Sequence, residues 1–320
     1  MTDFPDPTFV DVGGVRLAVY EAGDPASAAP PVILVHGWPE MAHSWKHQMR
    51  ALADAGFRVI APDLKGFGRS DAPKDVAQYD IRHMTDDLIG LLDALKIEKA
   101  IFCGHDWGGV IVWPLAHMHR ERVAGVIGVC TAHYPPLAIP EIEKIRANRG
   151  DRHYIVAFND DPSVEDVFSG EEEKFFCVMF QRAPKRAVLE QLGDRLFDIV
   201  GRIKHGPTPE LGGQVMGGDD LALYVEAYKK SGFHGGINLY RNIDRNHELL
   251  RDADATISAP ALWVGAEDDI FLPVEYAKRM DEWVPDLERH IIPDSGHWLM
   301  WEQPEALNMR MIDWLTRRFR

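Results

Sequence analysis

An aspartate lies between glycines at residues 104–109, where the sequence reads GHDWGG. The apolar residues 99–104 predict a strand before it, and the residues after it predict a helix. A tight turn between a strand and a helix, with small residues around it, exposes the side chain at its centre, and this arrangement is called a nucleophile elbow. Asp106 is therefore a candidate nucleophile. The alternative is that it only caps the following helix.

An aspartate at this position predicts a different chemistry from that of a serine. A serine needs a base to remove its proton before it attacks. An aspartate, with an ordinary pKa of about 3.9, is already ionised at neutral pH. A carboxylate can attack a saturated carbon that bears a leaving group, and the product is an ester. The sequence thus predicts alkyl transfer to Asp106, followed by hydrolysis of that ester.

Hydrolysis of the ester needs an activated water, and His297 in the segment DSGHW is the candidate general base. A carboxylate should orient this histidine and stabilise its charged form. Glu267, Asp268 and Asp269 follow a predicted strand, and the order nucleophile, acid, base matches this architecture. We favour Asp269, with Asp268 as the rival. The alternative is that the acids form a solvated turn and His297 lies in a surface loop.

The hydrolysis step also creates an oxyanion, which backbone N–H groups can stabilise. One donor should be Trp107, directly after the nucleophile, and the other should come from the first strand-to-helix loop. That loop contains His36, Gly37, Trp38 and Pro39. Trp38 can donate its N–H, whereas proline has none. The alternative is that this motif is an ordinary turn.

A larger framework must position these groups, and the sequence alternates strand-like and helix-like segments around them. Residues 84–97 place leucines at helical spacing, and residues from about 304 to 319 predict a final helix. Such alternation predicts an α/β fold with a mostly parallel central sheet and helices on both faces. The segments that predict strands are residues 30–37, 57–63, 99–104, 123–130, 259–269 and 287–298.

Strand-like segments are absent from the middle of the sequence. Helix-like pieces joined by Gly- and Pro-rich stretches, such as residues 205–220, occupy that part instead. We predict an α/β core in two parts, residues 1–132 and 254–320, interrupted by a helical lid at residues 133–253. Inserted segments of this kind often cover an active site.

The composition excludes several classes of function. The chain has 320 residues, 46% of them hydrophobic, and a net charge of −15. Such a charge disfavours binding to nucleic acid and to anionic lipid. No stretch is long enough to span a bilayer, and the acidic start is not typical of a signal peptide. We expect a cytoplasmic monomer or homodimer, with Cys103, Cys130 and Cys177 as buried thiols.

No metal or cofactor site is predicted. Residues 43–47 read HSWKH, with two histidines at helical spacing, but the glutamate of a zinc-protease motif and a third ligand are missing. The segment GGQVMGG follows no strand and therefore does not match a dinucleotide fingerprint.

With these pieces in place, the sequence resembles the epoxide hydrolases of the α/β-hydrolase superfamily over nearly the whole chain. HGWPE resembles their His-Gly-X-Pro motif, in which the proline is often cis and the third position often Phe. DLKGFGRS (63–70), GHDWGG and GHW match three further motifs of the family. The resemblance implies an α/β-hydrolase fold with an inserted helical lid.

Two segments of the predicted lid make the resemblance to epoxide hydrolases more specific. GGINLYRNIDRN (235–246) is similar to the epoxide hydrolase segment that carries one of two lid tyrosines, which indicates Tyr240. HYIVAFND (153–160) is similar to the segment carrying the other, which indicates Tyr154. An opening epoxide leaves as an alkoxide, and a phenol can give it a proton. The alternative is that both are buried tyrosines with a structural hydrogen bond.

The resemblance implies a cofactor-independent enzyme that converts a small apolar epoxide to a vicinal diol. A haloalkane dehalogenase with the same aspartate, histidine and acid is the first alternative, and Trp38 leaves open a second halide donor. A fluoroacetate-type dehalogenase is expected to have an arginine beside the nucleophile, where this sequence has Trp107. A non-catalytic binding protein on the same scaffold is the third hypothesis, against which the intact Asp106 and His297 argue.

Overall fold

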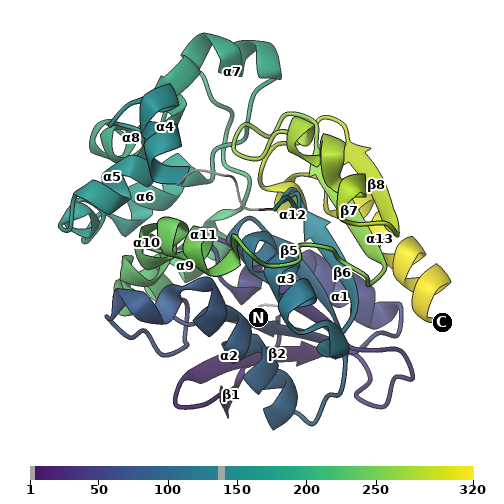
Figure 1. Ribbon diagram of the computed structural model, residues 1–320. Coiled ribbons are helices and arrows are strands. Elements are labelled where there is room, and N and C mark those ends of the chain that lie inside the picture. Colours follow the sequence, from purple (N-terminus) through teal and green to yellow (C-terminus); the bar gives the residue numbers. More distant parts are fainter. Residues whose placement is uncertain (1–3, 136–140) are drawn as a thin grey trace.

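An eight-stranded sheet forms the centre of the computed structural model, which describes residues 4–135 and 141–320. The strand order is β1-β2-β4-β3-β5-β6-β7-β8. The pairs β1–β2 and β2–β4 are antiparallel, and all later pairs are parallel (Figure 1). The strands are β1 (Thr8–Asp11), β2 (Arg16–Ala22), β3 (Val32–Val35), β4 (Val59–Pro62), β5 (Ala100–His105), β6 (Val123–Val129), β7 (Ala261–Ala266) and β8 (Leu287–Ile292).

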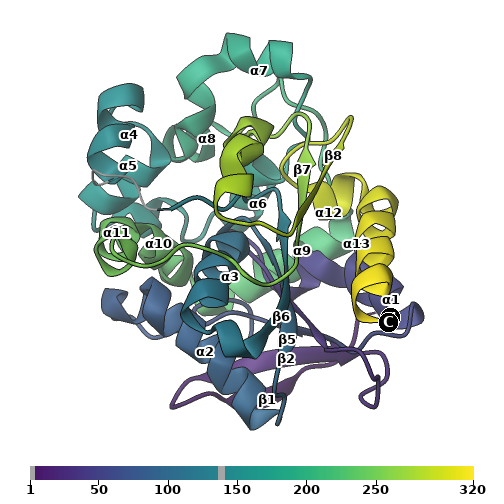
Figure 2. The same ribbon diagram turned by 45° about the vertical axis from the view of Figure 1, so that its right-hand side comes forward.

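Helices cover both faces of the sheet. Figure 2 shows α1 and α13 on one side of the strands, and α2 and α3 on the other. Every residue of β3, β4, β5 and β7 is buried, as expected for parallel strands between two helical layers. The core helices are α1 (Lys46–Asp54), α2 (Ile81–Ala94), α3 (Trp107–Met118), α12 (Leu299–Glu302) and α13 (Pro304–Phe319).

The chain between β6 and β7 supplies a second group of helices, α4 to α11, which we call the cap. Its helices lie together beside the core (Figure 1). In the described part of this segment the only strand pairing is an isolated bridge between Gln181 and Gln214. The predicted domain boundaries at residues 133 and 253 stay a prediction. The cap helices are α4 (Glu141–Arg149), α5 (Tyr154–Asp160), α6 (Glu172–Met179), α7 (Arg186–Leu192), α8 (Ile199–His205), α9 (Gly218–Ser231), α10 (His234–Arg241) and α11 (Ile243–Leu250).

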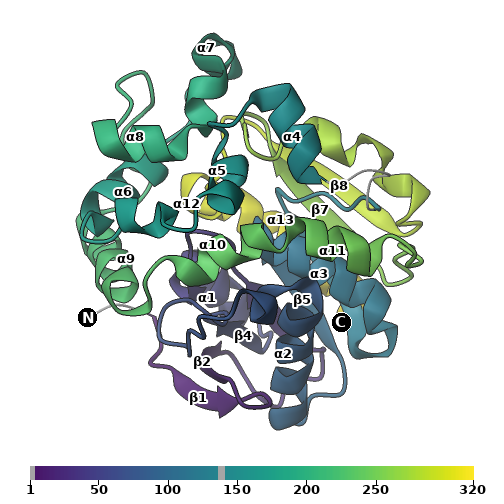
Figure 3. The same cartoon turned by 60° about the vertical axis from the view of Figure 1, so that its left-hand side comes forward.

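The cap is attached to the core through α9 and α10. On α9, Asp220 lies 2.7 Å from Nε2 of His43 and 2.5 Å from Nζ of Lys46. The hydroxyl of Tyr224, on the same helix, lies 2.6 Å from that of Ser44. Figure 3 shows α10 between α5 and the core. These contacts fix one side of the cap to the start of α1 and the turn before it.

The structure differs from the sequence-based expectation in two places. The N-terminal hairpin of β1 and β2 was not predicted. The edge strand β1 is short and mostly exposed, whereas β2 is longer and buries four of its residues. The helix predicted over residues 84–97 begins earlier, at Ile81, where the Asp80 side chain accepts a hydrogen bond from the N–H of His83.

None of the helices in residues 4–135 and 141–320 is both long and apolar enough to cross a membrane. The cytoplasmic location and the monomeric or homodimeric state stay predictions.

Candidate active site

Asp106 occupies a sharp turn between β5 and α3. Its φ of 50° and ψ of −121° are sparsely populated for a residue with a side chain, and such strain occurs most often at functional sites. Close backbone approach around the turn requires glycine. A Cβ at Gly37 would lie 2.5 Å from Oδ1 of Asp106, and a Cβ at Gly108 would lie 2.0 Å from the carbonyl oxygen of Val35. The turn at Asp106 therefore depends on glycines at residues 37 and 108.

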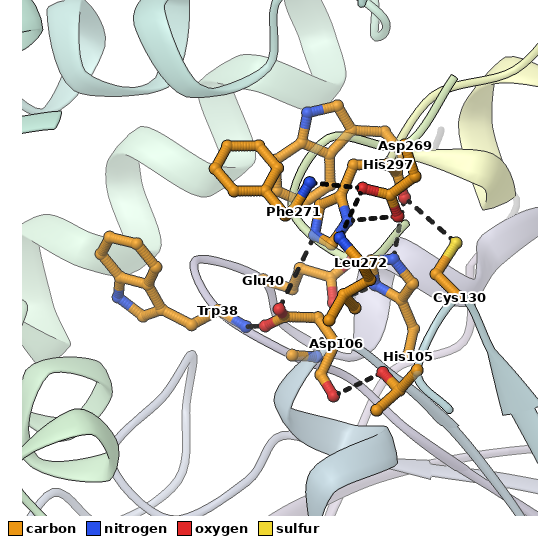
Figure 4. A network of polar contacts seen from close by, with 12 residues as sticks. Trp38, Glu40, His105, Asp106, Cys130, Asp269, Phe271, Leu272 and His297 are labelled. Atoms are coloured by element: carbon orange, nitrogen blue, oxygen red, sulfur yellow. Dashed lines mark hydrogen bonds and ion pairs between the residues drawn. The ribbon is translucent and has the colours of Figure 1, made fainter. Parts of the chain in front are cut away.

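The two oxygens of the Asp106 carboxylate have different surroundings (Figure 4). Oδ1 accepts a hydrogen bond from the backbone N–H of Trp38 at 2.9 Å, and the N–H of Trp107 also bonds this carboxylate. Oδ2 lies 3.7 Å from Nε2 of His297. Burial raises the pKa of Asp106, although His297 and the two N–H groups favour the ionised form. Oδ1 is thus held by Trp38, one of the predicted oxyanion donors, while Oδ2 faces the predicted base.

Asp269, rather than its neighbour Asp268, contacts the histidine. Oδ2 of Asp269 lies 2.9 Å from Nδ1 of His297, and Oδ1 accepts the backbone N–H groups of Phe271 and Leu272. Asp268 instead forms an ion pair with Lys185 at 3.5 Å. Burial opposes ionisation of Asp269, yet the charge of His297 and these hydrogen bonds hold its pKa below the ordinary value.

The surroundings of His297 favour its protonated form. Burial alone would lower the pKa of His297, but the charge and hydrogen bond of Asp269, and then the charge of Asp106, raise it to about 9. At pH 7 the imidazole is therefore mostly charged, between two carboxylates.

Replacement of Asp106 by asparagine is expected to lower the pKa of His297. One of the two carboxylates that favour the imidazolium is then lost, so the proton dissociates at a lower pH than in the wild type. An NMR titration of the His297 imidazole in both proteins measures this difference. An unchanged or higher midpoint in Asp106→Asn would mean that the two side chains are not electrostatically coupled.

Two cap tyrosines lie beside these residues. Tyr154 begins α5, Tyr240 lies in α10, and their hydroxyls are hydrogen-bonded to each other. Tyr240 also accepts a hydrogen bond from the Trp107 side chain, and these two rings lie edge to face at 5.0 Å. Burial raises the pKa of both phenols, and the charge of Asp106 raises both further. Both effects favour the protonated phenols beside Asp106.

The His-Gly-Trp-Pro segment adopts the form that the resemblance implies. The peptide between Trp38 and Pro39 is cis. Nε2 of buried His36 accepts the N–H of Leu64, so its Nδ1 carries the proton and donates to the carbonyl of Gly37 at 2.8 Å. His36 thus joins the first strand-to-helix loop to the neighbouring loop after β4.

The sequence analysis missed two buried groups that support the site (Figure 4). Oε2 of Glu40 accepts the N–H of Gly37 at 2.5 Å and lies 3.0 Å from Nδ1 of His105. Nε2 of His105 lies 2.8 Å from the carbonyl oxygen of His297. Burial opposes ionisation of Glu40, but His105 and the N–H of Gly37 hold its pKa below the ordinary value. Glu40 lies in HGWPE and His105 lies in GHDWGG, and these positions were the only sequence evidence that either residue supports the site.

The cysteines and the other histidines do not form a metal site in the described residues. All three cysteines are free, and Cys103 and Cys130 are buried, whereas Cys177 is partly exposed. The thiol of Cys130 donates to the carbonyl oxygen of His297 at 3.8 Å and therefore belongs to the surroundings of that histidine.

Comparisons with known proteins agree with this geometry. A family model described as the alpha/beta hydrolase fold matches residues 30–304. The chain is 36% identical over 319 residues to epoxide hydrolase A of Mycobacterium tuberculosis (strain ATCC 25618 / H37Rv), which covers 98% of both proteins. It is 37% identical to bifunctional epoxide hydrolase 2 of Sus scrofa, over 94% of this chain but 53% of that protein. The crystal structure of epoxide hydrolase A from Mycobacterium thermoresistibile matches 99% of both chains with a TM-score of 0.88 and 35% identity.

Proposed function

The chain belongs to the epoxide hydrolases of the alpha/beta hydrolase fold, and we propose that it opens an epoxide to a vicinal diol through an ester on Asp106. The observation that carries this mechanism is the asymmetric setting of the Asp106 carboxylate. Oδ1 accepts the N–H of Trp38, while Oδ2 faces His297. Two hydrogen-bonded phenols lie close enough for the charge of Asp106 to raise their pKa values.

In the first step, Oδ2 of Asp106 attacks one carbon of the epoxide ring and the bond from that carbon to oxygen breaks. The oxygen leaves as an alkoxide and takes a proton from Tyr154 or Tyr240. Because the two hydroxyls are hydrogen-bonded to each other, both can hold the ring oxygen while one of them gives up its proton. The products of this step are the hydroxyalkyl ester and a phenolate.

In the second step, His297 removes a proton from water as the water attacks the ester carbonyl. Formation of the ester removes the charge of Asp106, which helps to hold the proton on His297 in the resting site. The pKa of His297 therefore falls when the ester forms, and the neutral imidazole needed for this step becomes available. Trp38 and Trp107 stabilise the oxyanion. The proton that His297 loses when the ester forms restores the phenol, and the proton that His297 then takes from water restores the imidazolium. The alcohol leaves with the proton of the carboxylic acid, so Asp106 is a carboxylate again.

Aromatic side chains around the tyrosines indicate a small apolar substrate. The ring of Phe158 lies 5.7 Å from that of Tyr154, and Phe271 lies 5.0 Å from the imidazole of His297. Trp38 and Phe175 extend the same aromatic group, with ring centroids 5.8 Å apart. Such surfaces favour aryl or alkyl groups over charged ones.

The activity test compares an aryl epoxide with a matched bromoalkane and measures diol and free bromide. We expect diol from the epoxide and no bromide from the bromoalkane, because the two phenols serve an alkoxide, whereas a departing halide needs no proton. Bromide release without diol would instead assign the aspartate and histidine to a dehalogenase.

Tyr240→Phe and Tyr154→Phe are each expected to slow ester formation by about 10²-fold, because one hydrogen bond to the developing alkoxide is lost. The double variant should lose ester formation altogether. Rapid-mixing measurements of single turnovers separate this step from hydrolysis of the ester, which should change little. Tyr224→Phe is the matched control, since it removes a buried cap hydroxyl that contacts Ser44. Equal losses in this control would point to cap stability and away from proton donation.

A further inference from the structure

The indole of Trp38 fills the space that a side chain at residue 236 would need. A Cβ at Gly236 would lie 1.9 Å from Cδ1 and 2.2 Å from Nε1 of Trp38. Gly236 lies inside α10, where its backbone conformation is open to any residue. Residue 236 must therefore be glycine because there is no room for a side chain, and not because of its backbone conformation.

Packing alone holds the indole in place. Trp38 is 3% exposed, and its Nε1 has no hydrogen-bond partner among the described residues. Its ring meets Tyr240 and Phe158 edge to face, each at 5.4 Å between centroids. The shape of the surrounding surface, including the bare backbone of Gly236, thus determines where the indole lies.

The α10 helix cannot easily move away from the indole, because the core holds it along its length. At its start, a Cβ at Gly235 would lie 2.4 Å from the carbonyl oxygen of Gly66. Nε2 of His234 lies 3.1 Å from the carbonyl oxygen of Ala72. Just after its end, Asn242 donates to the carbonyl of Val76 at 2.7 Å. An added methyl group at residue 236 must therefore displace either the indole or the docked helix.

Trp38 connects the two groups that react with the epoxide. Its backbone N–H holds Oδ1 of Asp106 at 2.9 Å. Its indole packs on Gly236, which is four residues before Tyr240 and therefore on the same face of α10. A shift of the indole or of α10 would change the distance between the phenol and the nucleophile.

We propose that Trp38 and Gly236 form a size-matched pair that positions Tyr240 over Asp106. The indole of Trp38 is then a positioning element for ring opening, a role separate from the N–H that Trp38 gives to the oxyanion. This inference rests on the proposed function, because it assumes that Tyr240 assists ring opening.

The test measures ester formation and ester hydrolysis separately in Gly236→Ala, Trp38→Phe and the double variant. Gly236→Ala is expected to slow ester formation at least tenfold per folded molecule, because small displacements of catalytic groups have large effects on rate. Hydrolysis of the ester should change much less, since His297 performs it. A merely destabilised protein would instead keep its rate for each folded molecule.

The double variant Trp38→Phe/Gly236→Ala tests whether the effects of the two substitutions are coupled or independent. A phenyl ring at residue 38 is smaller than an indole and can turn away from α10, which makes room for the methyl group. Ester formation in Trp38→Phe/Gly236→Ala should therefore exceed that in Gly236→Ala by about tenfold, a non-additive result that identifies coupled residues. If Gly236→Ala does not fold, a folded and active double variant supports the pairing, and an unfolded or inactive one overturns it.

Gly218→Ala is the matched control, because it adds a methyl group to another cap helix at a position with no atom within 4 Å of the new Cβ. It should leave ester formation unchanged. Wild-type protein that forms no diol would overturn the proposed function itself. Diol formation by the wild type with equal rates of ester formation in Gly236→Ala would overturn the size-matched pair alone.

Discussion

Asp106→Asn is expected to abolish diol formation, with a loss of at least about 10⁴-fold, as is typical when a nucleophile is removed. The amide has nearly the shape of the carboxylate but lacks the charge that attacks the ring carbon. The elbow is tight, since a Cβ at Gly37 would lie 2.5 Å from Oδ1 of Asp106, but an amide of the same size as the carboxylate still fits. The thermal unfolding temperature should therefore change little, and it serves as the control for folding.

A single turnover in water labelled with oxygen-18 tests the same residue without any mutation. If the ring carbon bonds to Oδ2 of Asp106, the first diol molecule takes its new oxygen from the protein. The labelled oxygen from water then remains in the Asp106 carboxylate, where peptide mass spectrometry can locate it. Label in the first diol instead of in the Asp106 peptide would contradict the ester and favour direct attack by water.

His297→Gln is expected to stop the reaction after its first half. Ring opening needs Asp106 and the tyrosines, whereas hydrolysis of the ester needs a base, so the ester should accumulate. We expect a burst of one epoxide consumed per protein molecule, followed by turnover about 10²–10⁴-fold slower than in the wild type. Mass spectrometry of the intact protein should show an added mass equal to that of the epoxide.

The double variant Asp106→Asn/His297→Gln is the control for this trapping experiment. It should show neither the burst nor the added mass, because the ester has no carboxylate on which to form. Steady turnover of His297→Gln near the wild-type rate would exclude His297 as the base. The buried His105, whose Nε2 lies 2.8 Å from the carbonyl of His297, would then be the next histidine to test.

The sequence could not decide which carboxylate contacts His297. Three consecutive carboxylates follow β7, and their spacing along the chain left the choice between Asp268 and Asp269 open. In the folded loop, Asp269 turns inward to His297 and to two backbone N–H groups, while Asp268 pairs with Lys185. Neighbouring residues in a loop point in different directions, and only the surrounding structure determines which one meets a distant partner.

The role of Glu40 could not be predicted from the sequence either. It directly follows the His-Gly-Trp-Pro motif, yet its partner His105 comes from another strand. Sequence patterns carry no information about such a pair, because burial of the carboxylate depends on how two distant loops pack. The contact between Trp38 and Gly236 has the same origin, since it joins a core loop to a cap helix.

The resemblance to the epoxide hydrolases indicated the two tyrosine segments. The sequence by itself determined the α/β class, the strand-to-helix turn at Asp106 and the loop that carries His297. These features depend on short-range physics: hydrophobic periodicity, turn residues and the residue types that a reaction needs. Tertiary structure alone decided that Asp269 meets His297, that Glu40 meets His105, and that Trp38 lies against Gly236. Those contacts arise from long-range packing, in which shape and burial select partners that lie far apart in the chain.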